Sequence, residues 1–336
     1  MRILILFLIV AGACSRSETS EPAEQAPEPA AEEAAKSAEE AAPEQPPAPP
    51  HELEAPFALD TPPAVELLDA GKAPHKVLRT TFEAGAKQSL RVESSWTVSS
   101  LYGPLINTSA VMPSLVYELE TEAKETSDEG AQFDFRVTKV TAKSRKEVKP
   151  AQLKAAKKAV GSLKGATGSF SINARGIVEQ FAIDAPSNAS LLVSDMIDQI
   201  KQAIRLSSLP LPEEPVGKGA KWTATQVIEQ RSAKISHTST FELVGVKGER
   251  IRATSTHAAE TPKQKLELPG GRASSRFKLD ELDYSGDSKG TWPLNKLGPP
   301  SASEHTLTVF KMTAKAPKEE AVVMAVDTII KVKATR

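Results

Sequence analysis

The stretch ISHTSTFELVGVKGERIRATSTHA, residues 235–258, decides the fold. Apolar and polar side chains alternate through Ile235–Val244 and again through Glu249–Ala258, and Val246-Lys247-Gly248 lies between the two runs. Alternation with a period of two is typical of a half-buried strand, and a short connection containing glycine joins two such strands into a hairpin. The stretch therefore predicts an antiparallel β-hairpin.

The same alternation recurs along most of the chain after residue 57. Two segments differ from it and read as helices: Pro150–Val160, which starts with proline and is followed by Gly161, and the longer Pro186–Ser207. The sequence thus predicts a mainly β (α+β) protein. We expect antiparallel sheets with one long amphipathic helix packed on a sheet.

The longer predicted helix carries more apolar side chains than a single stripe needs. Packing of this stripe against the sheet as core is one expectation. If helix and sheet part at one end, a ligand groove is the alternative. The residues that would line it are Leu192, Met196, Ile200 and Ile204.

Similar sequence features recur in the two halves of the body, and this internal repeat predicts two pseudo-repeated lobes. Gly85-Ala86-Lys87 opens a strand that leads to Trp96, and Gly219-Ala220-Lys221 opens another that leads to Trp222. Two hairpins follow in each case, and the prolines near Leu209 separate the halves. The predicted division is a first β-rich lobe over residues 57–208, ending in the long helix, and a second antiparallel lobe over residues 209–336.

The N-terminus predicts export and a lipid anchor. Met1-Arg2 and the apolar run Ile3–Val10 have the form of a secretory signal, so residues 1–13 are expected to be removed. Ala11-Gly12-Ala13-Cys14 resembles the lipobox of bacterial lipoproteins, in which the cysteine is acylated. An ordinary signal with an incidental cysteine is the alternative, but the chain holds no second thiol to pair with Cys14. Ser15 rather than Asp follows, which by the same resemblance favours the outer membrane.

Residues 14–56 form a separate compositional region. They hold eleven glutamates against only Arg16 and Lys36, together with many prolines and alanines. Such a segment offers too little apolar surface to offset the entropy of ordering, so a disordered acidic tether is expected. The body after it is mildly basic, with charges that look scattered along the sequence. That pattern predicts no nucleic-acid binding.

A search for catalytic motifs gives no site. The chain has no G-x-S-x-G, H-E-x-x-H, P-loop or G-x-G-x-x-G sequence, so we expect no enzyme and no cofactor. The acidic cluster Asp280, Glu281, Asp283 and Asp287 fits no known cation loop. A solvated hairpin end is the expectation there.

The histidines give one sharper hypothesis. If Leu243 pairs with Ile251 and no bulge intervenes, His237 lies opposite His257. Two facing imidazoles are weak candidates for a zinc or copper site, because two ligands are too few. A structural histidine pair is the alternative.

The most distinctive part of the body is LPLPEEPVGKGAKW, residues 209–222. It resembles the segment L-P-x-x-P-V-G-x-G-x-x-W of an uncharacterised family of bacterial lipoproteins, with Leu211-Pro212 as two extra residues. That family has no established activity, so the resemblance implies no catalytic residue. The expected sheet-and-helix arrangement is also similar to the lipoprotein-carrier fold of Gram-negative envelopes.

These observations lead to a membrane-anchored envelope lipoprotein. The expected function is a non-enzymatic binding module for an apolar or envelope ligand, with a lipid or an envelope protein as partner. The alternative is a structural or assembly lipoprotein that binds another envelope protein.

Overall fold

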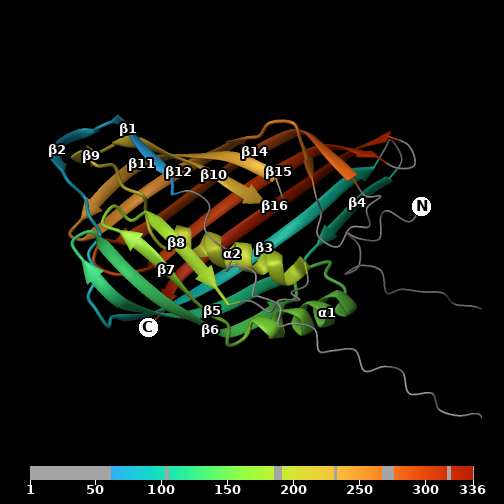
Figure 1. The fold of residues 1–336 in the computed structure, drawn as a ribbon, viewed down its shortest axis with the longest axis horizontal. Coiled ribbons are helices and arrows are strands. Elements are labelled where there is room, and N and C mark those ends of the chain that lie inside the picture. Colours follow the sequence, from blue (N-terminus) through green and yellow to red (C-terminus); the bar gives the residue numbers. More distant parts are fainter. Residues whose placement is uncertain are drawn as a thin grey trace, which may run out of the picture.

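The structure is a computed structural model that describes residues 62–102, 106–184, 191–230, 233–266, 276–315 and 319–335. Most of these residues belong to one 14-stranded sheet whose pairings are antiparallel, and a further pair, β2 and β9, forms a small separate sheet. Figure 1 shows the large sheet curving around helix α2. The prediction of a mainly β protein built from antiparallel sheets is confirmed.

The strands follow the alternation of the sequence. Their bounds are β1 Ala64–Asp69, β2 Lys72–Lys76, β3 Lys87–Tyr102, β4 Ile106–Val111, β5 Ser114–Ser127, β6 Gly130–Lys143, β7 Thr167–Asn173, β8 Val178–Ile183, β9 Val216–Lys218, β10 Lys221–Gln230, β11 Ala233–Lys247, β12 Arg250–Glu260, β13 Gln264–Leu266, β14 Arg276–Pro293, β15 Ser301–Lys315 and β16 Glu319–Thr335.

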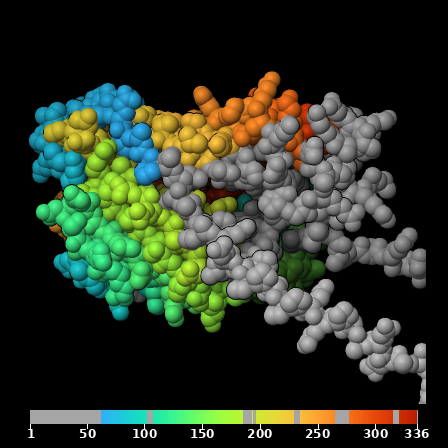
Figure 2. Space-filling model, in the orientation of Figure 1, coloured from blue at the N-terminus to red at the C-terminus, as the bar shows by residue number. Residues whose placement is uncertain are grey.

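The order of strands across the sheet is β1-β10-β11-β12-β14-β15-β16-β3-β5-β6-β7-β8, with β13 beside β14 and β4 beside β3. The two predicted lobes therefore share one sheet. Strand β16 pairs with β3 from Val322↔Tyr102 to Thr335↔Ser89, and β1 pairs with β10. Figure 2 shows β1 and β10 (blue and gold) at the upper left of the molecule and β7–β8 (yellow-green) directly below them.

Helix α1 spans Pro150–Val160, as the sequence predicts. The first N–H groups of a helix have no partner within the helix, so Pro150, which has no N–H, is well suited to this position. The side chain of Gln152 accepts a hydrogen bond from the Lys149 N–H at 3.0 Å. Gln152, Ala156 and Val160 are spaced four residues apart and form its buried face.

Helix α2 spans Leu191–Leu206 and has 16 residues. The prediction of one long helix over Pro186–Ser207 was therefore wrong in length. The helix ends before Ser207, whose hydroxyl donates to the Ala203 carbonyl, and residues 185–190 lie outside the described ranges. The prolines that follow could not continue the helix, because proline supplies no N–H.

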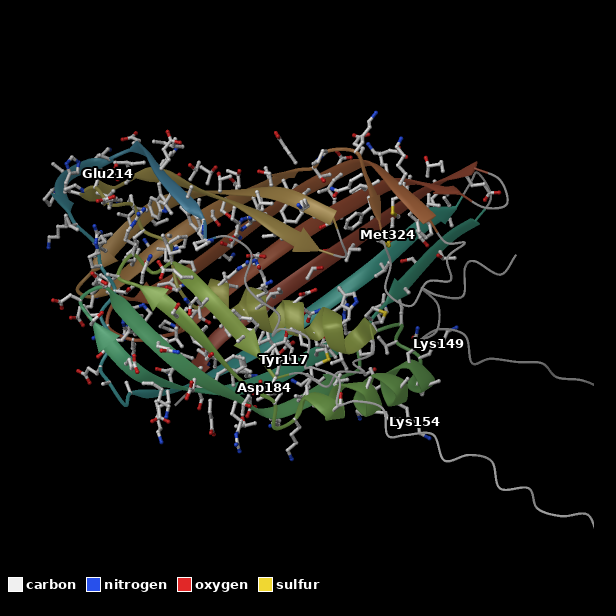
Figure 3. The ribbon with its side chains drawn as sticks, viewed as in Figure 1. Tyr117, Lys149, Lys154, Asp184, Glu214 and Met324 are labelled. Atoms are coloured by element: carbon white, nitrogen blue, oxygen red, sulfur yellow. The ribbon has the colours of Figure 1, made fainter. Side chains whose placement is uncertain are left out.

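The main core lies between α2 and the concave face of the sheet. Met196, Ile200 and Ile204 are fully buried there, with Trp96 and Trp222 in the same cluster. A second cluster lies further along β14–β16 and includes Leu279, Met312 and Met324. Figure 3 labels Met324 at the end of the sheet away from β2 and β9.

The segment of residues 209–222 connects the core to the sheet. The indole N–H of Trp222 donates to the Pro210 carbonyl at 2.7 Å, and Leu211 is fully buried. A Cβ at Gly217 would overlap the carbonyl oxygen of Lys72, so this position needs glycine for close strand packing. The distinctive residues of the segment thus serve the fold.

Candidate functional site

The β11–β12 hairpin brings the two predicted histidines together, although in a different register. Leu243 pairs with Ala253 rather than Ile251, because the two strands continue to a tight turn beyond the Lys247↔Arg250 pair and a one-residue bulge then precedes Gly245. His257 consequently lies opposite Ser239, and His237 lies two residues further along. A shift of two residues keeps both histidines on the same face. Their rings stack with centroids 5.5 Å apart and an interplanar angle of 23°.

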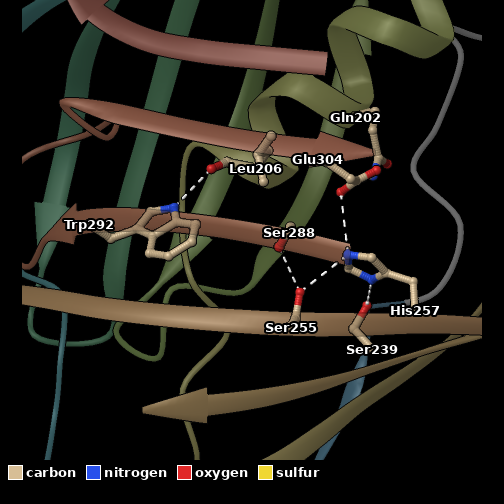
Figure 4. Close-up of polar contacts among 8 residues, drawn as sticks. All are labelled: Gln202, Leu206, Ser239, Ser255, His257, Ser288, Trp292 and Glu304. Atoms are coloured by element: carbon tan, nitrogen blue, oxygen red, sulfur yellow. Dashed lines mark hydrogen bonds and ion pairs between the residues drawn. The ribbon is translucent and has the colours of Figure 1, made fainter. Parts of the chain in front are cut away.

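His257 lies at the centre of a buried polar cluster. The Ser239 hydroxyl is 2.8 Å from its Nδ1, and the Ser255 hydroxyl is 3.2 Å from its Nε2. Ser255 continues to Ser288 on β14, with 2.6 Å between the hydroxyl oxygens. Figure 4 shows this chain of contacts running across three neighbouring strands. Burying hydroxyls costs little when each has a partner of this kind.

A carboxyl group from β15 completes the cluster. Gln202 of α2 donates from its amide nitrogen to both carboxyl oxygens of Glu304, at 3.0 and 3.2 Å. One of these oxygens lies 3.8 Å from Nε2 of His257, beyond hydrogen-bond distance. The side chains of His257 and Glu304 are only 5% and 7% exposed, so both groups have lost nearly all contact with water.

Burial sets the charge state of these groups. It raises the pKa of Glu304 to about 7, against the opposing effects of the Gln202 hydrogen bond and the Arg205 charge. It also lowers the pKa of His257 to about 4, although Asp287 acts the other way, and it lowers the pKa of His237 to about 4. Near neutral pH the imidazoles are therefore neutral, and the Glu304 carboxyl changes between hydrogen-bond donor and acceptor.

These side chains border a cavity of about 90 Å³ between the C-terminal half of α2 and the concave face of β10–β15. This is room for roughly six water molecules or a small organic group. Its polar lining residues are Gln202, Arg205, Ser208, Gln226, His237, Ser239, His257, Ser288 and Glu304. Its apolar lining includes Val178, Leu206, Ala224, Phe241 and Trp292.

The polar lining forms a band between the two hydrophobic clusters. On β11 the concave residues change from Leu243 and Phe241 through Ser239 and His237 to Ile235. The two ends of this row belong to different clusters, since Leu243 lies in the main core and Ile235 in the second one. Along β11 every second residue still faces the concave side within the band. The buried side chains there are polar rather than apolar.

The predicted groove around α2 is corrected by the structure. Met196, Ile200 and Ile204 have no exposed surface and lie in the main core, and none of them lines the cavity. Helix and sheet close together at these residues because facing apolar side chains fill the space. The side chain of Leu192 lies outside the described part of the chain, as does Cys14.

The weak metal hypothesis gains no third ligand. Within the described ranges, no group of three or more His, Cys, Asp and Glu side chains could hold a metal ion. His257 instead uses both ring nitrogens on serine hydroxyls. The acidic cluster does not form the expected hairpin end, because Asp280, Glu281, Asp283 and Asp287 all lie within the single strand β14. Glu281 and Asp283 are exposed there and pair with Lys311.

Glu304 and the three serines were not predicted from the sequence. Residues 306–312 alternate between apolar and polar side chains in the sequence, but β15 begins earlier than this run, at Ser301. Extending the alternation back by one step places Glu304 on the same face as Thr306, which is buried. A glutamate in phase with buried residues was the available signal.

Comparison with protein-family models and with curated proteins finds no match to this chain. No helix in the described ranges is long and apolar enough to cross a membrane. The resemblance to an uncharacterised lipoprotein family therefore stays a prediction from residues 209–222.

Proposed function

We propose that the protein is a lipid-anchored envelope lipoprotein that binds a small molecule in the cavity beside His257 and Glu304, without catalysis. The carrying observation is that a cavity of about 90 Å³ coincides with the buried polar band. Ligand sites are typically concave and largely apolar, with a few convergent polar groups, which describes this lining.

The lining selects the chemistry of the ligand. An entirely apolar ligand would offer no hydrogen bond to the remaining acceptor sites of the Ser288 hydroxyl and the Glu304 carboxyl, and a buried polar group left without a partner costs about 1–3 kcal/mol. A ligand with hydroxyl, amide or carboxyl groups replaces those bonds. This refines the expectation of an apolar ligand to a small molecule with polar groups and a partly apolar body.

The membrane location rests on the sequence. The apolar run Ile3–Val10 and the small residues before Cys14 support export and acylation, and Ser15 supports the outer membrane. Acylation at more than one position gives stable membrane anchoring.

The assembly function is the second candidate. It is favoured by the closed packing of α2, because a fully buried helix supports a structural role for that part of the molecule. It predicts that the cavity binds only water.

The pseudo-repeat also stays a proposal. Strands β3 and β10 each begin a run of consecutive antiparallel strands, and Trp96 and Trp222 both reach the main core. If the lobes arose by duplication, the cavity belongs mainly to the second lobe, since β10–β15 supply most of its strand residues.

A cavity-filling variant tests the binding function. Ala224 lines the cavity and is 5% exposed, so Ala224→Leu places three more carbon atoms in it. Val227 on the same strand is 49% exposed, and Val227→Leu is the matched control. Each full-length protein is purified gently and weighed by native mass spectrometry after its folding is checked by circular dichroism.

The proposed function predicts a bound small molecule in the wild type and in Val227→Leu, and its loss in Ala224→Leu. A wild-type protein that carries no small molecule, or an Ala224→Leu protein that keeps it, contradicts binding in this cavity.

A further inference from the structure

A cluster of lysines surrounds helix α1, on a part of the molecule that is separate from the cavity. Residues 143–164 hold eight basic side chains and a single acidic one, Glu147. Arg145 is used by the fold, because it donates to the carbonyls of Trp96 and Met112. The other seven are all exposed and are here called the α1 lysine patch: Lys143, Lys146, Lys149, Lys154, Lys157, Lys158 and Lys164.

The patch lies on the outside of the body. Helix α1 buries Gln152, Ala156 and Val160, so Lys154 and Lys158 project from the opposite face. Figure 3 shows Lys149 and Lys154 beside α1, at the margin of the molecule. The loop before α1 and the turn after it add lysines to the same region.

Some lysines elsewhere on the sheet have carboxylate partners. Lys139 lies 3.3 Å from Glu118, and Lys278 lies 2.9 Å from Asp280. Within the described ranges, by contrast, no carboxylate lies within 4 Å of a patch lysine.

The fold explains only part of this charge. Lys157 and Lys158 lie in the last turn of α1, where cations interact favourably with the helix dipole. Lys154 lies three and four residues before them, and like charges at these spacings destabilise a helix. The remaining lysines lie outside the helix, so neither effect accounts for the patch as a whole.

From the exposure, the single sign of charge and the lack of carboxylate partners, we propose that the α1 lysine patch binds an anionic phospholipid surface. Clusters of four to eight basic residues bind anionic lipid in this way, with each lysine strengthening binding by about fivefold. Residues 143–164 contain no aromatic side chain, so the contact is electrostatic and superficial. It would orient the body on the membrane to which Cys14 is expected to be anchored.

Amine labelling of the full-length protein in vesicles tests the proposal. The protein is reconstituted in phosphatidylcholine with and without phosphatidylglycerol, and the labelling rate of each lysine is followed by mass spectrometry. Because the protein is anchored in both vesicles, the comparison isolates the patch from the anchor and from the cavity.

We expect Lys146, Lys149 and Lys164 to label about tenfold more slowly on the anionic vesicles, because several lysines contribute at once. Replacing Lys154, Lys157 and Lys158 by Gln should weaken the contact about a hundredfold and abolish this protection. The matched control replaces the exposed Lys247, Lys289 and Lys331 by Gln and should retain it.

Equal labelling rates on the two vesicles would overturn the proposal. So would protection that is the same in neutral vesicles and in detergent, since that result would assign the patch to the acidic segment of residues 14–56. Protection that the control triple also loses would show a general charge effect and would equally contradict it.

Discussion

Replacing Glu304 by Gln should change how the stability of the protein depends on pH. The buried carboxyl has a pKa raised from 4.5 to about 7, mainly by desolvation. At a pH between 4.5 and about 7, Glu304 is protonated in the folded protein and ionised in the unfolded chain. The resulting stabilisation is fully present below pH 4.5 and is lost as pH rises to about 7. At about 1.4 kcal/mol for each pH unit, the loss amounts to about 3 kcal/mol.

The amide introduced by Glu304→Gln has nearly the shape of the protonated carboxyl and does not titrate, so the variant escapes this loss. Relative to wild type, Glu304→Gln should become more stable by about 3 kcal/mol between pH 4.5 and pH 8. The pKa values of His237 and His257 are lowered to about 4, so their contribution is present above pH 6.5 and is lost as pH falls. Both proteins keep these histidines, and the difference between the two curves isolates Glu304.

Urea unfolding at a series of pH values measures this difference. The slopes of the unfolding transitions should agree between the two proteins, so that a shift of midpoint reports stability alone. If the free energies of unfolding of wild type and variant run parallel from pH 4.5 to pH 8, then Glu304 is not a buried group of raised pKa. The description of the polar band would then fail.

Three further changes test the core, a buried contact and the anchor. Ile200→Ala should destabilise the protein by about 3 kcal/mol in urea unfolding, because Ile200 is fully buried. The control Val227→Ala changes an exposed position and should cost much less. Equal costs would refute the closed packing of α2. Arg145→Met should cost about 2 kcal/mol by removing two charge-assisted hydrogen bonds to carbonyls, and an unchanged urea midpoint would show that these bonds are not formed. Cys14→Ala should abolish incorporation of radioactive palmitate, and continued labelling would exclude Cys14 as the acylated residue.

The strands and α1 could be predicted from local patterns because alternation and helix-boundary residues act over a few neighbours. The register of β11–β12 could not, since it depends on the tight turn beyond the Lys247↔Arg250 pair and on the one-residue bulge before Gly245, and the alternation reveals neither. The predicted C-terminal limit of α2 lay within one residue of the structure, because the prolines from Pro210 onward cannot continue a helix, whereas the predicted start at Pro186 lies outside the described ranges.

The candidate site was only half visible in the sequence. The alternation along β11 and β12 placed His237 and His257 on the same face of the sheet. Their neighbour Glu304, however, comes from a strand two places away from β12. Whether that glutamate faces water or the concave side depends on the curvature of the whole sheet. The excess of basic residues over positions 143–164 was visible in the sequence, but the exposure of the seven lysines of the α1 lysine patch was not, because it depends on which face of α1 packs on the sheet.

The most direct test of the binding function is a crystal structure of the protein purified from its native envelope, at a resolution that shows ordered water. The account predicts density for a small molecule, larger than water, in hydrogen-bond contact with Glu304 or His257 in the cavity beside α2. A cavity that holds only separate water molecules, or one that has closed so that Ala224 packs against α2, would contradict it.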